Sequence, residues 1–384
     1  MEIKRKLASI REISALVPIE GADKIELAQI DGWQVVVKKG EFRPGDRCIY
    51  FEIDSFLPVR PEFEFLRASS FKNHPELGQG FRLKTVKLRG QISQGLALPT
   101  SILVNFGSYD DDIDAYYNEN DTCSINLGSD CTEYIGVKKW EDPIPAQLAG
   151  MVKGTFPNFI PKTDQERVQN MQLTPAEPKE VTYIDGDGNT VTRMVNKRKP
   201  VIRDFTYEVT LKLDGSSMTV YNNNGEIGVC SRNMDLIEDE TNAYWRVARK
   251  SGLIDAMQKW PNYALQGELM GPGVQGNREG LQDLQFFLFD IYDTKLGEYL
   301  TPRRRKTFFK YLQEDSTIEH VPVVDANFSF DEVANDHDTV LNYLLKMADR
   351  PSLNNPIAEG LVFKAMDSNF SFKVINNNFL LNEK

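Results

Sequence analysis

Apolar and polar residues alternate in several short stretches near the start of the chain, and this pattern predicts strands. Residues 25–30 and 33–37 alternate on either side of an Asp31-Gly32 pair, which is typical of a hairpin turn. Further strands are predicted at 47–53, 81–88 and 95–98. Several short strands at this spacing favour a small barrel, with the OB-fold first among the candidates.

The periodicity stops in residues 105–132, which are rich in Asp, Asn and Ser, so we expect a long loop or an insertion there. Pro143 and Pro145 suit a linker. The pattern therefore predicts two domains, an OB-like module at 1–145 and a larger domain at 150–384.

In the larger domain, strands and helices alternate. The string Asp185-Gly-Asp-Gly-Asn189 predicts a hairpin turn. Strands are predicted around 206–213, 217–222 and 226–231, and helices at 239–250 (ended by Gly252), from Thr301-Pro302 to about Glu314, and from a Ser329 cap to Met347. These elements predict an α+β chain.

Composition narrows the class of protein. The 384 residues are 41% hydrophobic and 26% charged, as in a soluble globular protein. No apolar run approaches about 18 residues and the start has no hydrophobic signal, so we expect a cytoplasmic protein without a membrane partner. We also expect a monomer. Four scattered cysteines favour free thiols in a reducing compartment. Only three histidines are present, which argues against a histidine-based triad.

The net charge of −11 argues against tight, nonspecific binding of nucleic acid. The charge is unevenly distributed, however. Acidic residues crowd 110–121, and basic residues cluster at 138–139, 193–203 and 303–306. A single basic cluster is more often a solvated face than a phosphate site, so these clusters alone do not establish nucleic-acid binding.

The candidate chemistry centres on Lys212, which ends an apolar, β-branched run and is followed by Leu213-Asp214-Gly215. Lys212 and Asp214 share a strand face because side chains repeat with period 2. Alone, such a pair is ordinarily a salt bridge. Five further strings follow in order, namely Cys230-Ser-Arg-Asn233, Gln266-Gly-Glu-Leu269, Phe286-Phe-Leu-Phe-Asp-Ile-Tyr292, Glu359-Gly-Leu-Val-Phe-Lys364 and Ser371-Phe-Lys-Val-Ile-Asn376.

In this order the six strings resemble the motifs of the covalent nucleotidyltransferase superfamily, which includes polynucleotide ligases and capping enzymes. The β-rich module before the core, the closing string near the chain end and the segment 156–170 resemble the RNA ligase 5 family. The resemblance implies an OB-like β-barrel followed by a nucleotidyltransferase (ATP-grasp-like ligase) domain of antiparallel sheets flanked by helices. It also implies an ATP-dependent RNA ligase that repairs RNA.

The resemblance implies a role for each matching residue. Lys212 corresponds to the lysine that becomes joined to AMP, with Lys373 as the second catalytic lysine. Carboxylates that hold Mg²⁺ or Mn²⁺ correspond to Asp214, Glu268 and Glu359. Arg232, Phe289 and Glu268 correspond to nucleotide contacts, with Phe289 stacked on adenine. The last motif has Ile375 where many members have a second lysine, so Lys364 or Arg167 is expected to hold the triphosphate.

The chemistry of adenylyl transfer explains why lysine and carboxylate residues are needed. A lysine attacks phosphorus as a neutral amine, whereas a free lysine titrates near about 10.4. Desolvation and nearby positive charge lower the pKa and activate the nucleophile. The implied substrates are ATP and a nicked duplex with RNA on the 3′-hydroxyl side, sealed through lysyl-AMP and a 5′-adenylylated end. Magnesium keeps several waters, so we expect some carboxylates to contact it through water.

Other interpretations remain open at this point. Phe289 alternates with Phe287 and Ile291, which favours core packing; Glu359 before glycine suits a turn, and Arg232 suits the surface. A capping-type guanylyltransferase is one alternative function. A nonenzymatic RNA-binding protein with an OB module and a decayed core is another.

Overall fold

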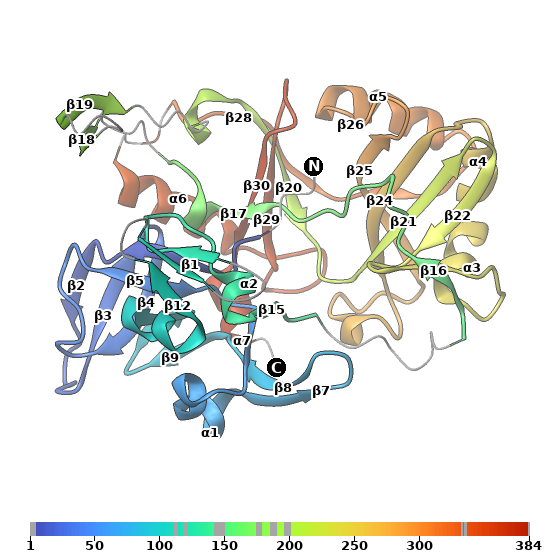
Figure 1. Cartoon of the computed structure of the whole chain (residues 1–384). Coiled ribbons are helices and arrows are strands. Elements are labelled where there is room, and N and C mark those ends of the chain that lie inside the picture. Colours follow the sequence, from blue (N-terminus) through green and yellow to red (C-terminus); the bar gives the residue numbers. More distant parts are fainter. Residues whose placement is uncertain are drawn as a thin grey trace. The chain divides into compact units, whose positions relative to one another are not determined.

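The chain folds into two compact units, Met1–Ala149 with Leu380–Lys384, and Gly150–Phe379. The structure is a computed structural model, and it describes residues 5–110, 114–117, 122–141, 150–173, 179–184, 190–195, 201–331, 333 and 336–382. Figure 1 shows the course of the chain through both units.

The first unit is built from short antiparallel strands. These are β1 (Ala8–Glu12), β2 (Ala15–Pro18), β3 (Ile25–Ile30), β4 (Trp33–Lys38), β5 (Arg47–Phe51), β6 (Ser55–Pro58), β7 (Phe71–His74), β8 (Gly78–Arg82), β9 (Thr85–Leu88), β10 (Gln91–Gln94), β11 (Leu96–Pro99), β12 (Ser108–Asp110), β13 (Ala115–Tyr117), β14 (Thr122–Ser124) and β15 (Lys138–Lys139). Short helices η1 (Pro61–Leu66), α1 (Arg67–Ser70), η2 (Thr100–Phe106) and α2 (Thr132–Ile135) connect them.

The predicted hairpin at Asp31 is confirmed, since β3 and β4 pair from Ile30 against Trp33. Asp31 adopts a left-handed φ of 51°, a conformation that Asp tolerates better than most residues. β5 pairs with β1 on one side and β11 on the other. Apolar residues of these strands, including Ile10, Ile49 and Phe51, form the core of this β-rich unit.

Two expectations for this unit are wrong. The predicted strand 81–88 is divided between β8 and β9, because Leu83 leaves the ladder to hydrogen-bond the backbone of Asp54 and Ser55. The segment 105–132, where a long loop or an insertion was expected, contains the three-stranded sheet β12-β13-β14. Its Cys123 forms a disulfide with Cys131, so the expectation of four free thiols is also wrong; Cys48 and Cys230 are free and buried.

The second unit contains two large sheets (Figure 1). The larger one has the order β16 (Val152–Thr155), β23 (Met234–Leu236), β22 (Glu226–Cys230), β21 (Ser216–Asn223), β24 (Tyr263–Met270), β25 (Gln285–Asp293) and β26 (Glu298–Tyr299), with β27 (Glu319–His320) beside β25. The other has the order β17 (Glu166–Arg167), β30 (Ser371–Ile375), β29 (Gly360–Ala365), β20 (Tyr207–Lys212) and β28 (Val323–Phe328). A separate hairpin pairs β18 (Lys179–Ile184) with β19 (Thr190–Val195).

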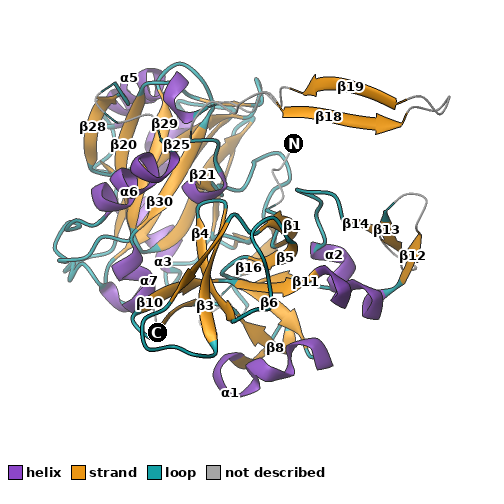
Figure 2. Cartoon of the chain, turned by 90° about the vertical axis from the view of Figure 1, so that its left-hand side faces the viewer, coloured by secondary structure: helices purple, strands orange, loops and turns teal. Residues whose placement is uncertain are grey.

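Central strand β20 is buried on both faces except at its last residue. Tyr207, Val209 and Leu211 point into the main apolar core, whereas Glu208, Thr210 and Lys212 share the opposite face. Helix α6 (His337–Ala348) contacts β30, and Figure 2 shows it lying across the five-stranded sheet. The mixed sheets and helices confirm the predicted α+β class.

The remaining helices are α3 (Ala243–Lys250), α4 (Leu253–Gln258), α5 (Pro302–Leu312) and α7 (Asn377–Asn382), with turns η4 (Val168–Asn170), η5 (Ile202–Asp204) and η6 (Gln275–Asn277). The Thr301-Pro302 start of α5 is confirmed. The Ser329 cap is wrong, because Asp336 caps α6 and accepts a hydrogen bond from the Thr339 backbone. No helix among these described residues is long and apolar enough to span a membrane. The turn 185–189 lies outside the described residues.

Candidate active site

Lys212 is held at the end of β20 by a carboxylate from the next strand of the sheet. Its Nζ lies 2.7 Å from Glu359 Oε1, and 27% of the Lys212 side chain remains exposed. The sequence pattern favoured Asp214 as the ordinary salt-bridge partner, but Asp214 follows the strand and pairs with Arg278 at 3.4 Å. The Lys212 side chain is thus partly accessible, and its amine is fixed in direction by Glu359.

The glycine after Glu359 explains how this carboxylate reaches the amine. Gly360 begins β29 and lies opposite Lys212 in the ladder, so residue 359 is adjacent to the end of β20. A Cβ at position 360 would lie 2.2 Å from the Val374 carbonyl oxygen, which no side chain could tolerate. The Glu-Gly pair therefore follows from close approach of two backbones.

Glu268 reaches the same place from the larger sheet. Its Oε1 accepts a hydrogen bond of 3.1 Å from the Gly215 backbone N–H, in the turn between β20 and β21. A Cβ on Gly215 would lie 2.5 Å from the Leu269 carbonyl oxygen, so only glycine allows the turn to lie this close to β24. Glu268 is consequently tied to the segment that carries Lys212 and Asp214.

The electrostatics of this cluster are strongly coupled. Burial lowers the pKa of Lys212, but Glu359 and Glu268 together raise it above its usual value. Burial, followed by the Glu359 charge, raises the pKa of Asp214 to about 6. Burial also raises the pKa of Glu268 to about 8, against the opposing effect of Lys212. The neutral amine expected at Lys212 therefore requires added positive charge, such as that of a metal ion.

Carboxylates that repel one another in a partly desolvated cleft are suitable ligands for a divalent cation. However, no group of three such side chains in the described part of the chain lies close enough to hold an ion by itself. The residues thus fit a metal bound by one or two of Asp214, Glu268 and Glu359, with the other positions left to water or phosphate oxygens. This is the coordination that Mg²⁺ prefers.

Two cationic residues lie side by side at the edge of the five-stranded sheet. Lys373 on β30 is opposite Arg167 on β17 in a parallel ladder. The Lys373 Nζ lies 2.8 Å from Asp164 Oδ1, and Arg167 is buried. Lys364 is located differently, since its Nζ contacts Asp290 at 2.6 Å and the Phe289 carbonyl at 2.6 Å. Of the two expected replacements for the missing lysine, only Arg167 is beside Lys373.

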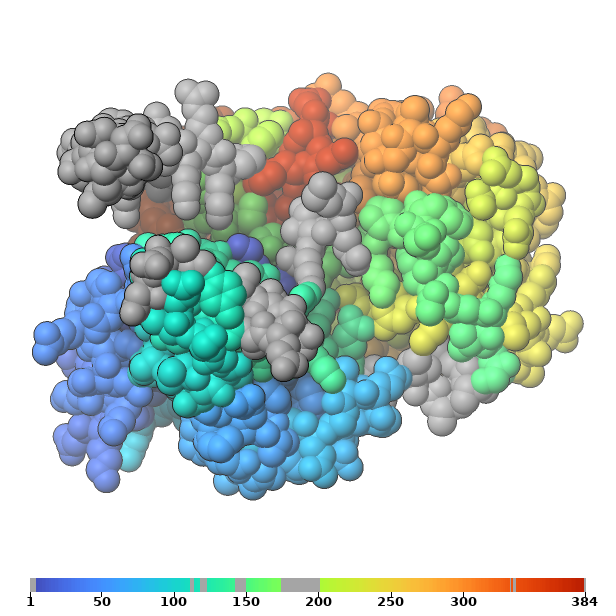
Figure 3. Space-filling model, in the orientation of Figure 1, coloured from blue at the N-terminus to red at the C-terminus, as the bar shows by residue number. Residues whose placement is uncertain are grey.

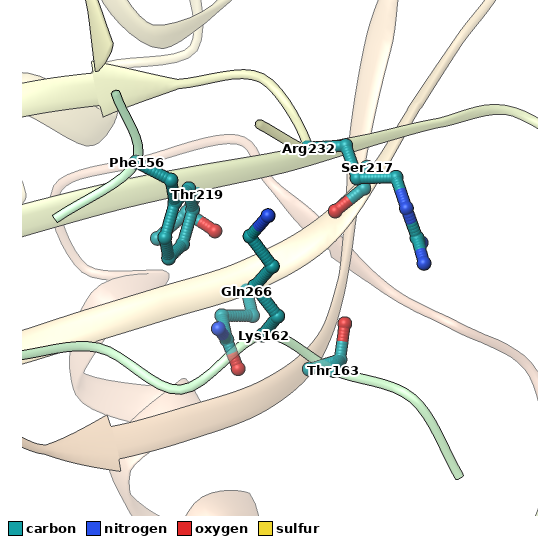
Figure 4. A pocket seen from close by; sticks show the side chains of 7 residues that line it. All are labelled: Phe156, Lys162, Thr163, Ser217, Thr219, Arg232 and Gln266. Carbon is teal, nitrogen blue, oxygen red and sulfur yellow. The ribbon is translucent and has the colours of Figure 1, made fainter. Parts of the chain in front are cut away.

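Arg232 lines a pocket on the larger sheet. Figure 4 shows this pocket, whose lining is Phe156, Lys162, Thr163, Ser217, Thr219, Arg232 and Gln266. Ser217 and Thr219 lie opposite Glu268 and Gln266, so one sheet face joins the pocket to the carboxylate cluster. Phe289 does not belong to this lining; it packs half-buried against the main core, with Lys364 Nζ 5.5 Å from its ring centre.

The segment 156–164 covers the pocket. The Phe156 N–H donates to the Asn233 carbonyl at 2.9 Å, and Lys162 donates to the Asn233 side chain at 2.8 Å. In Figure 3 this part of the chain, in green, lies at the surface beside the yellow strands of the larger sheet. Phe156, Lys162 and Gln266 lie in strings that the sequence singled out, but no role was expected for them, because the motifs assign roles to other residues of those strings.

Comparisons with known proteins agree with both halves of the chain. An OB-fold domain model matches residues 7–100, and an RNA ligase model matches residues 205–375. No curated protein matches the sequence.

Solved structures of a Naegleria gruberi RNA ligase are similar over nearly the whole chain. A mutant with AMP and Mn is 41% identical with a TM-score of 0.79, covering 99% of this chain and 99% of that one. A mutant with ATP and Mn is 40% identical with a TM-score of 0.78, covering 98% and 99%. The same ligase with PPi is 41% identical with a TM-score of 0.79, covering 98% of both chains.

Proposed function

This chain belongs to the RNA ligase family, and from that premise we propose that it seals nicks in duplex nucleic acid through a lysyl-AMP intermediate. Lys212 attacks the α-phosphorus of ATP, forming a nitrogen–phosphorus bond and releasing pyrophosphate. The AMP then moves to a 5′-phosphate end, which frees Lys212. Finally a 3′-hydroxyl on an RNA strand attacks that end, and AMP leaves as the phosphodiester forms.

The Lys212–Glu359 pair is the observation that carries this proposal. The amine is partly exposed, lies 2.7 Å from a carboxylate, and borders two further acids. Before it attacks, the ammonium must lose a proton, and the carboxylates that raise its pKa oppose this. A bound Mg²⁺ or Mn²⁺ supplies positive charge that neutralises those carboxylates and the phosphates. The similar ligase structures carry Mn together with ATP or AMP.

The positions of the other site residues suggest their roles in the proposed reaction. Asp214, Glu268 and Glu359 hold the metal, directly or through water. Lys373 and Arg167 bind phosphate oxygens from adjacent strands, as their ladder register allows. Lys364 is not retained as a phosphate ligand, because Asp290 already holds its amine in a buried ion pair. Arg232 contacts the nucleoside, and stacking of Phe289 on adenine remains a prediction.

The first unit would bind the nucleic acid near the nick. Its match to an OB-fold domain supports this role, because such barrels offer a face for oligonucleotides. The RNA repair role, the monomeric state, the cytoplasmic location and the boundary near residue 150 remain part of the same proposal.

A nick-sealing assay tests the proposal. The wild-type chain, ATP and Mg²⁺ or Mn²⁺ are mixed with nicked duplexes whose sugars on either side of the break are ribose or deoxyribose. We expect sealing when ribose carries the 3′-hydroxyl, and none with Lys212→Met. Lys153→Met is the matched control, because Lys153 forms an exposed pair with Glu226 at 2.8 Å. Sealing by Lys212→Met would contradict the proposal.

A further inference from the structure

Arg278 lies beside the candidate active site but belongs to none of the six motif strings. Its Nη1 lies 3.4 Å from Oδ2 of Asp214, and 28% of the Arg278 side chain is exposed. The contact uses one of the two carboxylate oxygens of Asp214. The other oxygen, Oδ1, is therefore available to a further partner.

The loop that carries Arg278 has an unusual backbone. Gln275, Gly276 and Asn277 have left-handed φ values of 43°, 69° and 48°. Such a run is unfavourable for residues other than glycine, and it persists only where the surroundings hold it. The Asn277 side chain does so, because it accepts a hydrogen bond of 3.0 Å from the Leu281 N–H and donates one of 2.9 Å to the Leu281 carbonyl. The loop therefore presents Arg278 from a fixed position.

A second segment holds the backbone of Arg278 and of the residue after it. Asn355 Nδ2 donates to the Arg278 carbonyl oxygen at 3.1 Å. The Asn354 N–H donates to the carboxylate of the buried Glu279 at 2.6 Å, and Asn354 Nδ2 donates to the Glu279 carbonyl at 3.0 Å. Both asparagines precede Glu359 by a few residues. The segments that lead to Arg278 and to Glu359 are thus bound to each other.

The guanidinium of Arg278 lies over an aromatic ring. Its Cζ is 4.5 Å from the centre of the Phe379 ring in α7, and Phe379 is buried. A cation over such a ring is attracted by the π electrons, and a planar guanidinium stacks on the ring while its edge donates hydrogen bonds. Phe379 thus holds the guanidinium in the place from which it reaches Asp214.

The start of α7 is tied to a second acid of the cluster. The N–H of Asn376, directly before the helix, donates to the Glu359 carbonyl oxygen at 2.9 Å. Asn376 is buried, so this hydrogen bond is shielded from water. One short segment therefore contacts the backbone of Glu359 and, through Phe379 and Arg278, acts on the side chain of Asp214.

We propose that Arg278 is a positioning residue that turns Asp214 toward the divalent metal before ATP arrives, and that Phe379 holds Arg278 in place for this. Carboxylates that bind a metal are oriented by hydrogen bonds to other groups, and loss of such a group weakens the metal site. Arg278 occupies Oδ2, so Oδ1 is the oxygen left for the ion or for one of its waters. This inference rests on the proposed function, because it takes Asp214 as a metal ligand.

Direct binding of Mn²⁺ tests the role of Arg278. The full chain without nucleotide is titrated with Mn²⁺, and the free ion is measured by electron paramagnetic resonance. We expect Arg278→Met to weaken the tightest site by at least about 10-fold. Arg249→Met is the matched control, because Arg249 also pairs with a carboxylate, that of Glu238, and lies over a ring, that of Trp245. It should bind Mn²⁺ like wild type.

Two results of this titration would overturn the inference. One is an equal affinity of wild type and Arg278→Met for Mn²⁺. The other is a wild type that binds no Mn²⁺ in the absence of nucleotide, since Asp214 would then not be set for the metal beforehand.

A double-variant cycle tests the path through Phe379, and Phe379→Leu also serves as the second variant if Arg278→Met does not fold. Phe379→Leu keeps a buried apolar side chain but removes the ring, and should weaken Mn²⁺ binding about threefold. Adding it to Arg278→Met should cause no further loss, because the ring then has no guanidinium to hold. Losses that multiply, or no loss in Phe379→Leu alone, would overturn the role of the ring.

The metal dependence of adduct formation separates positioning from a merely structural role. With ATP, Arg278→Met should need at least about 10-fold more Mn²⁺ for half of its maximal rate, while the maximal rate stays within about threefold of wild type. An unchanged Mn²⁺ requirement with a lower maximal rate would contradict the inference. If wild type binds Mn²⁺ but forms no adduct with any nucleotide, the proposed function fails, whereas the Mn²⁺ titration still decides the role of Arg278.

Discussion

At the scale of single residues, the proposed attack on ATP depends on the protonation state of Lys212. Glu359 and Glu268 raise its pKa even though burial opposes them. The amine is therefore protonated in the absence of a metal, and this state protects it from other electrophiles. In the proposed mechanism, neutralising these acids lowers the pKa of Lys212 and generates the nucleophile.

We expect Glu359→Gln to increase the reactivity of Lys212 toward an amine-specific acylating reagent in metal-free buffer near pH 8. Loss of the adjacent charge lowers the lysine pKa, and each pKa unit changes the neutral fraction about tenfold. Peptide mapping gives the modification rate. The same variant should lose adduct formation with ATP, because Glu359 is a proposed metal ligand.

Glu226→Gln is the matched control, since it removes an exposed carboxylate that lies 2.8 Å from Lys153. It should leave the rate at Lys212 unchanged. An unchanged or slower reaction of Lys212 in Glu359→Gln would show that this carboxylate does not control the amine.

The order of the motifs along the sequence identified Lys212 and the acids around it as candidate site residues. It could not predict which acid forms the ion pair with Lys212. The expected Lys212–Asp214 pair assumed that the strand continues past Lys212, and the strand ends there. Glu359 reaches Lys212 only through the strand order of the folded sheet. The hydrogen bond from Gln266 to the Pro161 carbonyl oxygen could not be predicted for the same reason, because the two residues are far apart in the sequence.

At the scale of elements, a buried polar network joins the two sheets of the second unit. It follows the Glu208–Lys212 face of β20. Arg305 of α5 contacts Glu208 directly and Asp290 at 3.5 Å, and Asp290 contacts Lys364 at 2.6 Å. Arg305 is only 1% exposed. The network fixes α5 and β25 against β20, behind the candidate active site.

Replacing Arg305 should lower the free energy of unfolding. Arg305→Met leaves Glu208 and Asp290 short of a counter-charge in the interior, and we expect a loss of about 3–5 kcal/mol in the free energy of unfolding. Chemical denaturation measures it. Arg304→Met removes the neighbouring exposed pair with Glu298 and should cost less than about 1 kcal/mol. Equal losses in the two variants would contradict a structural role for the network.

His320 makes the stability of this region depend on pH. Burial and the Arg305 charge lower its pKa to about 4 from 6.5. The unfolded chain therefore binds a proton first, so the neutral histidine contributes stability that is present above about pH 6.5 and is lost as the pH falls toward 4.

We expect wild type to lose about 1–2 kcal/mol more than His320→Gln between these pH values, since solvent screening reduces the effect in a half-buried side chain. Denaturation of both proteins across that range gives the difference. Parallel pH profiles would show that His320 does not titrate in this way.

Strands were easier to predict from the sequence than the buried polar network around Arg305. The alternation of apolar and polar residues, together with turn residues, predicted β3, β4 and β20 to β22. These signals depend only on neighbouring residues in the sequence. The division of β8 from β9 and the start of α6 depend on backbone contacts that arise only in the fold, such as the cap at Asp336. The basic string 303–306 was expected to be a solvated face or a phosphate site, yet its Arg305 is an interior residue.

At the scale of the molecule, the two units have separate apolar cores. The Cys123–Cys131 disulfide belongs only to the first unit. We expect Cys123→Ser with Cys131→Ser to lower the stability of the first unit by about 2–3 kcal/mol, as expected for a short closed loop. Calorimetry should show an earlier transition, while adduct formation with ATP stays at the wild-type rate.

Wild type treated with a thiol reductant is the companion sample and should behave like the double variant. Loss of adduct formation in either sample would show that the second unit depends on the first for its chemistry. No change in the melting of either sample would show that the disulfide does not stabilise its unit.

The central claim is that one lysine becomes covalently bonded to AMP. Peptide mass spectrometry after incubation of the full chain with ATP and Mn²⁺ tests it most directly. The account predicts an AMP adduct on the peptide that contains Lys212, and none on that peptide when a chelator removes the metal. A folded, metal-loaded protein that carries no adduct, or carries it on another lysine, would contradict the account.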